Sequence, residues 1–62
     1  MKEEHLIYSL NEGESYSRPF DSVYFMRVKG GISIIDIETN QEVEFLSNTL
    51  PIEEAEKIIK KY

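Results

Sequence analysis

The stretch that decides the fold is residues 22–46, SVYFMRVKGGISIIDIETNQEVEFL, in which two turn signals separate three runs of strand-forming residues. Residues 29–32, KGGI, predict a tight hairpin turn with Gly30 and Gly31 in the loop, because glycine reaches positive φ without steric cost. Asn40 predicts a second turn that is closed by a residue in the left-handed conformation. The sequence therefore predicts a three-stranded antiparallel meander.

These turns also predict how the strands pair, and so which side chains share a face of the sheet. The first turn pairs Lys29 with Ile32, and the second pairs Ile37 with Gln41. One face is predicted to be the core, and it collects Tyr24, Met26, Val28, Ile35, Ile37, Val43 and Phe45. The other face is apolar in one half and acidic in the other, and it collects Val23, Phe25, Arg27, Ile32, Ile34, Asp36, Glu42, Glu44 and Leu46.

A C-terminal helix is predicted from about residue 51 to residue 61, and we expect it to cover the core face. Pro51 suits a first helical turn, acidic residues gather near the N-terminal end of this segment, and lysines gather near its C-terminal end. Apolar residues recur at spacings of three and four, which indicates one buried stripe. The N-cap is expected at Thr49 or Leu50.

Two shorter segments precede the meander. Residues 5–10 predict a strand from the alternation of Leu6, Tyr8 and Leu10. Residues 16–20 predict an extended edge or a connector, because the proline in this segment cannot donate to a ladder. The chain is therefore predicted to be one small α+β domain over residues 1–62, a small antiparallel sheet (β-β-β-β-α) with one C-terminal helix packed on one face.

The second face is predicted to be an interface. With the helix on the core face, Phe25, Ile32, Ile34 and Leu46 are expected to form an exposed apolar patch beside Arg27. A chain of 62 residues buries only about 60% of its unfolded surface, and this one has no cysteine for a disulfide. We therefore expect a homodimer stacked through this patch, and a folded but monomeric or inactive Phe25→Asp variant. The alternative is that residues 5–10 and 16–20 fold over this face as ordinary core.

The charge of the chain points to a basic partner. Twelve acidic residues against seven basic ones give a net charge of −5, which disfavours direct binding of nucleic acid and favours the basic groove of a nucleic-acid enzyme or repressor. Asp36, Glu42 and Glu44 share a predicted face, with Glu38 in the turn, and alternate carboxylates along a strand lie about 7 Å apart, close to the spacing of phosphates. This acidic contact surface is predicted to mimic a nucleic-acid backbone. The alternative is a solvated face that prevents edge aggregation.

No catalytic, cofactor-binding or metal-binding residue is predicted. The only histidine is His5, no serine has a neighbouring base, and the glycine pair is explained by the hairpin turn. No apolar run approaches the roughly 20 residues that cross a bilayer, and the N-terminus lacks the apolar segment of a signal peptide. We expect a cytoplasmic protein without enzymatic activity and without membrane contact.

The sequence thus predicts a noncatalytic, acidic protein-binding module that inhibits or regulates a partner by occupying its surface. Tyr16, Arg18 and Phe20, in an irregular segment, are expected as further contacts. A small free-standing chain of this kind suits a phage or mobile-element antagonist of a host enzyme. Two alternatives remain open: a dimer cleft with Arg27 and Tyr16 that sequesters an anionic small molecule, and a structural subunit of a larger assembly.

Overall fold

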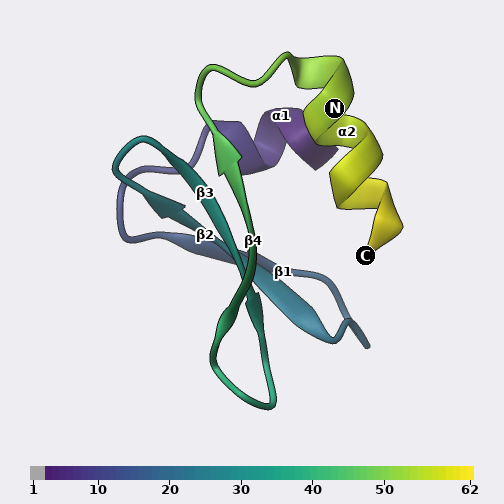
Figure 1. Ribbon diagram of the computed structural model, residues 1–62. Coiled ribbons are helices and arrows are strands. Elements are labelled where there is room, and N and C mark those ends of the chain that lie inside the picture. The colour runs from purple at the N-terminus through teal and green to yellow at the C-terminus, as the bar shows by residue number, and fades with distance from the viewer. Residues whose placement is uncertain (1–2) are drawn as a thin grey trace.

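The fold is a four-stranded antiparallel sheet with both helices on one side, and the computed structural model describes residues 3–62 (Figure 1). The elements are α1 (Glu3–Tyr8), β1 (Ser15–Ser17), β2 (Val23–Val28), β3 (Gly31–Asp36), β4 (Glu42–Ser47) and α2 (Ile52–Lys61). The sheet order is β1-β2-β3-β4, with each strand antiparallel to its neighbours. The predicted α+β class is confirmed. Residues 1–2 of the predicted domain lie outside the described residues.

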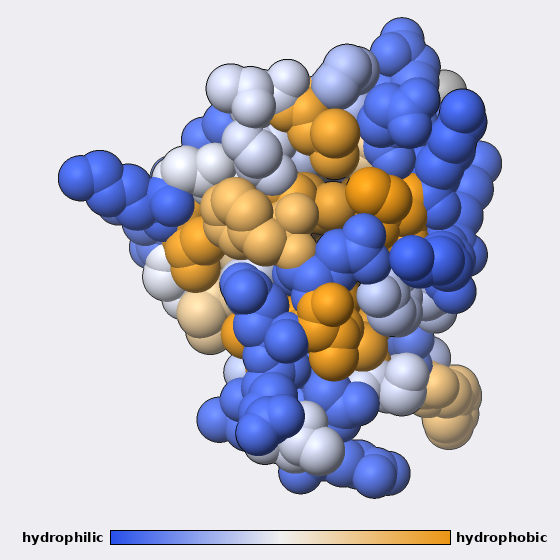
Figure 2. All heavy atoms as spheres, viewed as in Figure 1, coloured by the Kyte–Doolittle hydropathy of each residue, from blue (hydrophilic) through white to orange (hydrophobic). Residues whose placement is uncertain are grey.

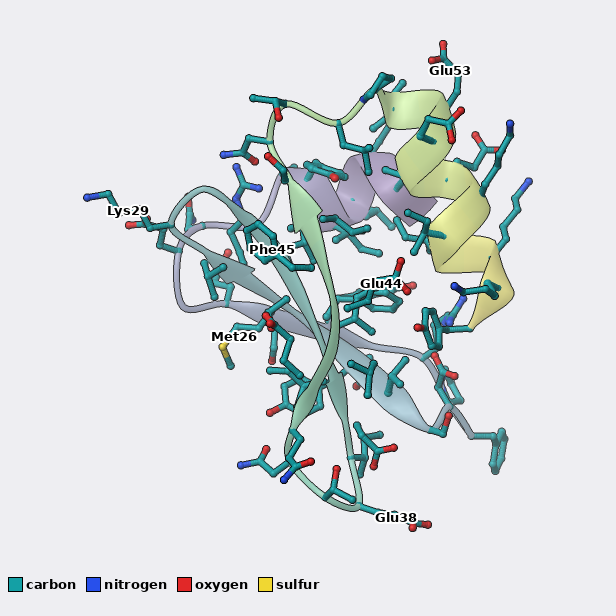
Figure 3. All side chains as sticks on the ribbon, in the orientation of Figure 1. Met26, Lys29, Glu38, Glu44, Phe45 and Glu53 are labelled. Carbon is teal, nitrogen blue, oxygen red and sulfur yellow. The ribbon has the colours of Figure 1, made fainter. Side chains whose placement is uncertain are left out.

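The helices define two unequal faces of the sheet. The face under the helices, here the covered face, presents Val23, Phe25, Ile32, Ile34 and Leu46 to Ile7 of α1 and to Ala55 and Ile59 of α2, and together these residues form the core. The opposite face, here the open face, carries Tyr24, Met26, Val28, Ser33, Ile35 and Phe45 by strand alternation. Figure 3 shows Met26 and Phe45 on one side of β4 and Glu44 on the other, toward α2.

The predicted interface is wrong, because it lies on the covered face. The side chains of Phe25, Ile32, Ile34 and Leu46 are each 0% exposed. Residues from both α1 and α2 pack against them, so the predicted core face is the one left without a lid. These four side chains are therefore unavailable for the stacked homodimer contact that the sequence predicted.

The first segment is a helix rather than the predicted strand. Leu6 and Tyr8 alternate with polar neighbours only in part, since Ile7 lies between them and the apolar run is continuous. In the helical conformation Ile7 is fully buried under α2, and Leu6 stays 40% exposed. The partly buried Tyr8 also packs against the core, and the element order is α-β-β-β-β-α.

The loop of the first hairpin lies one residue earlier than predicted, which shifts the pairing of β2 with β3 by two residues. Lys29 and Gly30 form its loop, with φ of 88° at Gly30, and Val28 pairs with Gly31 at the start of β3. A register shift of two residues preserves side-chain alternation, so the predicted grouping of side chains from β2 and β3 holds. The error concerned only which group the helices cover.

The second turn confirms the left-handed Asn40, whose φ is 59°. The pairing near it differs from the prediction, because Asp36 rather than Ile37 lies opposite Gln41, with Asp36 N donating to Gln41 O at 2.9 Å. Ile34 pairs with Glu44 and Ile35 with Glu42, so Val43 is the extra residue of a β-bulge. This bulge changes the face to which Glu42 belongs.

The outer segments agree with the sequence in outline. Residues 16–17 lie in the edge strand β1, and Pro19 lies in the turn that follows it. The helix α2 occupies Ile52–Lys61, with Pro51 rather than Thr49 or Leu50 at the N-cap. Within residues 3–62, no helix combines the length and the apolar character that crossing a membrane would require.

Candidate protein-interaction surface

Three of the large apolar side chains that stay exposed among the described residues, Ile37, Val43 and Phe45, lie on or beside the open face. Phe45 in its middle is 45% exposed, and Ile37, which continues this face beyond β3, is 49% exposed. Ile37 is held in line with β3 because its N–H donates to Ser22 O at 3.0 Å. Val43, the bulged residue of β4, adds a further side chain that is 47% exposed. In Figure 2, where β4 lies in front as in Figure 1, apolar groups form a band across the middle of the view that runs on toward α2, and smaller apolar groups lie above and below it among hydrophilic ones.

A close backbone approach positions Phe45. A methyl group added at Gly31 would lie 2.7 Å from Phe45 Cζ and would also collide with the backbone oxygen of Leu46, so only glycine fits beneath the ring. The aromatic ring covers the position that has no side chain, a packing that compensates for glycine in a strand. Phe45 is therefore held in place at the surface by the strand beside it.

One carboxylate lies within this apolar surface. Ser33 on the open face is 6% exposed, and its Oγ donates to Glu42 Oε1 at 2.6 Å. In a regular strand Glu42 would share a face with Glu44, and the bulge at Val43 turns it to the other side. The open face thus presents a negative group close to the exposed Phe45, which lies opposite Ser33.

The predicted row of acidic residues does not form, because its members are divided between the second hairpin turn, the open face and the covered face. Asp36 Oδ1 accepts hydrogen bonds from Glu38 N at 2.8 Å and Thr39 N at 3.0 Å, which closes the hairpin turn. Glu38 is exposed and points away from the molecule at the tip of this hairpin (Figure 3). Glu42 lies on the open face. Together with the bulge, these positions remove the regular spacing on which backbone mimicry depends.

Glu44 lies on the covered face and bonds to the C-terminal end of α2. Its Oε1 accepts a hydrogen bond from Tyr62 Oη at 2.7 Å and lies 3.3 Å from Lys61 Nζ, both at the C-terminal end of α2. The hydrogen bond to this carboxylate raises the pKa of Tyr62, and partial burial and the negative charge act in the same direction. Glu44 therefore ties the end of α2 to β4.

The turn after β1 presents a strained, exposed aromatic residue. Phe20 has φ of 64° and is fully exposed, at a turn position where glycine is usual. Arg18 and Asp21 close the turn with a hydrogen bond of 2.7 Å from Arg18 Nε to Asp21 Oδ2. The guanidinium of Arg18 lies 5.4 Å from the ring centre of Phe25, which anchors the turn to the core. The turn is thus braced, and its large apolar side chain contributes nothing to the core.

The other predicted contact residues are engaged within the molecule. The Tyr16 ring centre lies 6.3 Å from that of Phe25, and Tyr16 is half-buried. Arg27 Nη1 donates to Asn48 Oδ1 at 2.8 Å, and its guanidinium lies 5.8 Å from the centre of the Tyr8 ring. Burial raises the pKa of Tyr8, while the nearby Arg27 charge lowers it in part. Of the three predicted loop contacts, Phe20 is the exposed one.

The open face was missed at the sequence level because its residues were assigned to the core. The sequence carries one signal against that assignment, the hydroxyl of Ser33 at the centre of the predicted core face. Ser33 pairs with Met26 on one side and Phe45 on the other, and its largely buried hydroxyl holds the exposed Glu42 carboxylate, so a lid over this face would have to bury that carboxylate. The centre of the covered face, by contrast, is entirely hydrocarbon.

The described part of the chain offers no obvious centre for chemistry. Residues 3–62 enclose no pocket, and they contain no group of three histidine, cysteine, aspartate or glutamate side chains arranged to hold a metal ion. Comparison with known proteins finds no family model, no curated protein and no solved structure that matches this chain.

Proposed function

We propose that this chain is a noncatalytic protein-binding module that regulates or inhibits a partner protein by occupying its surface through the open face. The observation that carries the proposal is the exposure of three large apolar side chains, Ile37, Val43 and Phe45, each between 45% and 49%, on or beside a sheet face that no helix covers. Contiguous apolar surface of this kind is typical of protein contacts.

The charge around the open face indicates the chemistry of the partner. Glu42 lies over Ser33 near Phe45, and Glu38 projects from the adjacent hairpin tip. The whole chain carries a net charge of −5, which speeds encounter with a positive surface. We expect an apolar patch bordered by lysine or arginine, in a cytoplasmic protein, since this cysteine-free chain does not need an oxidising compartment.

The small-molecule alternative has less support. It relies on Arg27 and Tyr16 as ligand-binding groups. Arg27 is bonded to Asn48 and packed on Tyr8, and Tyr16 packs on Phe25. A ligand would have to displace these contacts, whereas a partner protein reaches the open face without any rearrangement.

The test compares two pairs of exposed apolar residues by affinity capture from a host lysate. In the first variant Val43 and Phe45 are both changed to serine, which makes the open face polar. In the matched control Leu6 and Ile52, which are 40% and 39% exposed on the helices, are both changed to serine. Circular dichroism confirms folding of both variants. Quantitative mass spectrometry then measures which proteins each variant retains.

We expect a protein that the wild type and the control retain and the open-face variant loses. Once this protein is purified, raising the salt concentration should weaken its binding, and Glu42→Gln should reduce that salt dependence because one charge pair is lost. Equal capture by the wild type and both variants would contradict the proposal. Binding that is insensitive to salt would support the apolar contact and contradict the prediction that the partner surface is basic.

A further inference from the structure

One hydrogen-bonding edge of the strand β4 has no neighbouring strand among the described residues. This strand lies at one edge of the sheet and, within residues 3–62, pairs only with β3, whereas the other edge is the three-residue strand β1. Such an edge offers free N–H and C=O groups to another strand. In Figure 1, β4 lies in front of the other strands, and the apolar band of Figure 2 crosses the same region.

The ladder shows which residues of β4 face outward. Asp36 N donates to Gln41 O and Asn48 N donates to Gly30 O, each at 2.9 Å, so even-numbered residues of β3 face β4. Paired residues alternate between hydrogen-bonded and non-hydrogen-bonded positions along an antiparallel ladder. Leu46 and Glu44 therefore bond to β3, and Phe45 and Ser47 direct their main-chain groups away from the sheet.

The usual protection of an edge strand is weak here. Charged side chains on an edge discourage pairing, and β4 contains two glutamates. Both carboxylates turn back onto their own molecule: Glu42 bonds to Ser33, and Glu44 bonds to Tyr62. The bulge at Val43 disturbs only the first part of the strand, which leaves residues 44–47 in regular pairing with β3.

We propose that two copies of this chain pair through β4, antiparallel, about a twofold axis at Phe45. In this register Phe45 faces its own copy, Val43 faces Ser47, and Glu44 faces Leu46. The outward N–H and C=O of Phe45 and the N–H of Ser47 then become hydrogen-bonded, while Ser47 O already accepts from Leu50 N at 3.0 Å within its own chain, and two four-stranded sheets join into one. Both open faces lie on the same side of the joined sheet, which makes their apolar surface continuous.

Charge selects this register over its neighbour. The other register that overlaps most of β4 has its axis at Glu44, and it sets that carboxylate opposite its own copy in a dimer of two chains that each carry −5. Like charges directly opposite one another destabilise a sheet, whereas an aromatic cross-strand pair stabilises it. In the Phe45 register no acidic residue of β4 faces another.

The first test uses the unmodified protein in sedimentation equilibrium. The mass should rise from that of one chain, 7.3 kDa, to that of two chains as the concentration increases. Added salt should favour the dimer, because it screens the repulsion between two chains of like charge. This response is opposite to that expected for a basic partner, so the two interactions can be told apart. A single-chain mass under all conditions would overturn the proposal.

The second test locates the contact by amide hydrogen exchange at low and high protein concentration. Exchange at Phe45 and Ser47 should slow as the dimer forms, since their outward N–H groups become bonded. The internal control is the opposite edge, where Ser15 and Ser17 face outward because Arg27 N bonds to Glu14 O at 2.9 Å. Their exchange should not change. A dimer in which Phe45 and Ser47 stay unprotected would refute strand pairing and indicate stacked open faces instead.

A third test fixes the register in a chain that has no cysteine of its own. An equimolar mixture of Val43→Cys and Ser47→Cys should form a mixed disulfide under mild oxidation much faster than either variant forms one with itself. The axis at Glu44 instead predicts that Val43→Cys pairs best with Phe45→Cys. Dominance of that second combination, or equal rates in all mixtures, would contradict the Phe45 register.

Discussion

The two faces of the sheet are similarly rich in large apolar residues, yet the helices cover only one of them. The centre of the covered face contains Phe25, Ile34 and Leu46 with no polar group among them. The centre of the open face contains Ser33, whose hydroxyl bonds to the exposed Glu42. Burying that pair under a helix would remove a carboxylate from water at a cost of several kcal/mol. In this sheet a central hydroxyl and the exposed carboxylate that it holds, rather than total hydrophobicity, distinguish the contact face from the core face.

The polar groups at the ends of the covered face do not contradict this rule. Glu44 and Arg27 both lie there, at the margins of the core, and each has a partner supplied by an adjacent element. Glu44 bonds to Tyr62 of the C-terminal end, and Arg27 bonds to Asn48 after β4. A polar side chain at the rim keeps access to water and to partners, whereas one at the centre of a face does not.

Truncating one phenylalanine on each face of the sheet should give very different losses of stability. Phe25→Ala should cost about 3–5 kcal/mol, because it empties the centre of the core, and a domain of this size has little more stability than that. The earlier expectation of a folded Phe25→Asp variant is therefore replaced by an unfolded one. Phe45→Ala, which removes a half-exposed ring, should cost roughly 1 kcal/mol. Urea unfolding followed by circular dichroism measures both, and equal losses would break the distinction between the faces.

Substitutions at the two adjacent glycines of the first hairpin should destabilise the protein for different reasons. Gly31→Ala should cost about 3 kcal/mol, because the new methyl group would meet backbone as well as the Phe45 ring. Gly30→Ala meets nothing within 4 Å but must adopt φ of 88°, which costs about 1–2 kcal/mol. Asparagine tolerates that conformation, so Gly30→Asn should recover stability in thermal melts and Gly31→Asn should not. Rescue at Gly31 would mean that Phe45 is not held by that contact.

Much of the fold was predictable from local patterns. The glycine pair and Asn40 predicted both hairpins, and alternation then grouped the side chains of β2 and β3 correctly despite a shift of two residues in their pairing. The charge gradient and apolar spacing of residues 51–61 predicted α2. These features depend on neighbouring residues alone, and such signals survive errors of a residue or two in register.

The rest depended on tertiary information. The sequence favoured a strand at residues 5–10, so α1 was not predicted. The one helix that was predicted was placed on the other face, which left the face that contains Phe25 without a cover. The bulge at Val43 has no sequence signal of its own, yet it separates Glu42 from Glu44 and dissolves the predicted acidic row. Among the predicted contact residues, Phe20 is exposed as expected, because its turn is set by local chemistry.

A smaller effect concerns Phe20, the apolar side chain that belongs to neither face. Phe20→Gly should raise the stability by about 0.5–1 kcal/mol, because it relieves a positive φ of 64° and exposes nothing new. If Phe20 contacts the partner, the same change should weaken binding, so stability and affinity would move in opposite directions. Thermal melts and titration with the captured partner measure the two. A variant that melts higher and binds as well as the wild type would assign Phe20 to the turn alone.

A change at the C-terminal end tests whether the hydrogen bond from Tyr62 to Glu44 holds α2 at the edge of the covered face. Tyr62→Phe should lower the free energy of unfolding by about 1 kcal/mol near neutral pH, because one hydrogen bond to a carboxylate is lost at a partly exposed site. The pKa of Tyr62 is raised in the folded protein above its ordinary value of 10.0. The bond therefore contributes fully below that value and is lost as the pH rises through the folded pKa, since the unfolded chain releases the proton first. Urea unfolding at a series of pH values should show wild type and variant converging above about pH 10.

The matched control places both chains in a Glu44→Gln background, where the difference between tyrosine and phenylalanine should shrink at neutral pH. A gap that stays constant through the alkaline range, or that persists without the carboxylate, would mean that packing of the ring, and not its hydrogen bond, holds the end of α2 against β4.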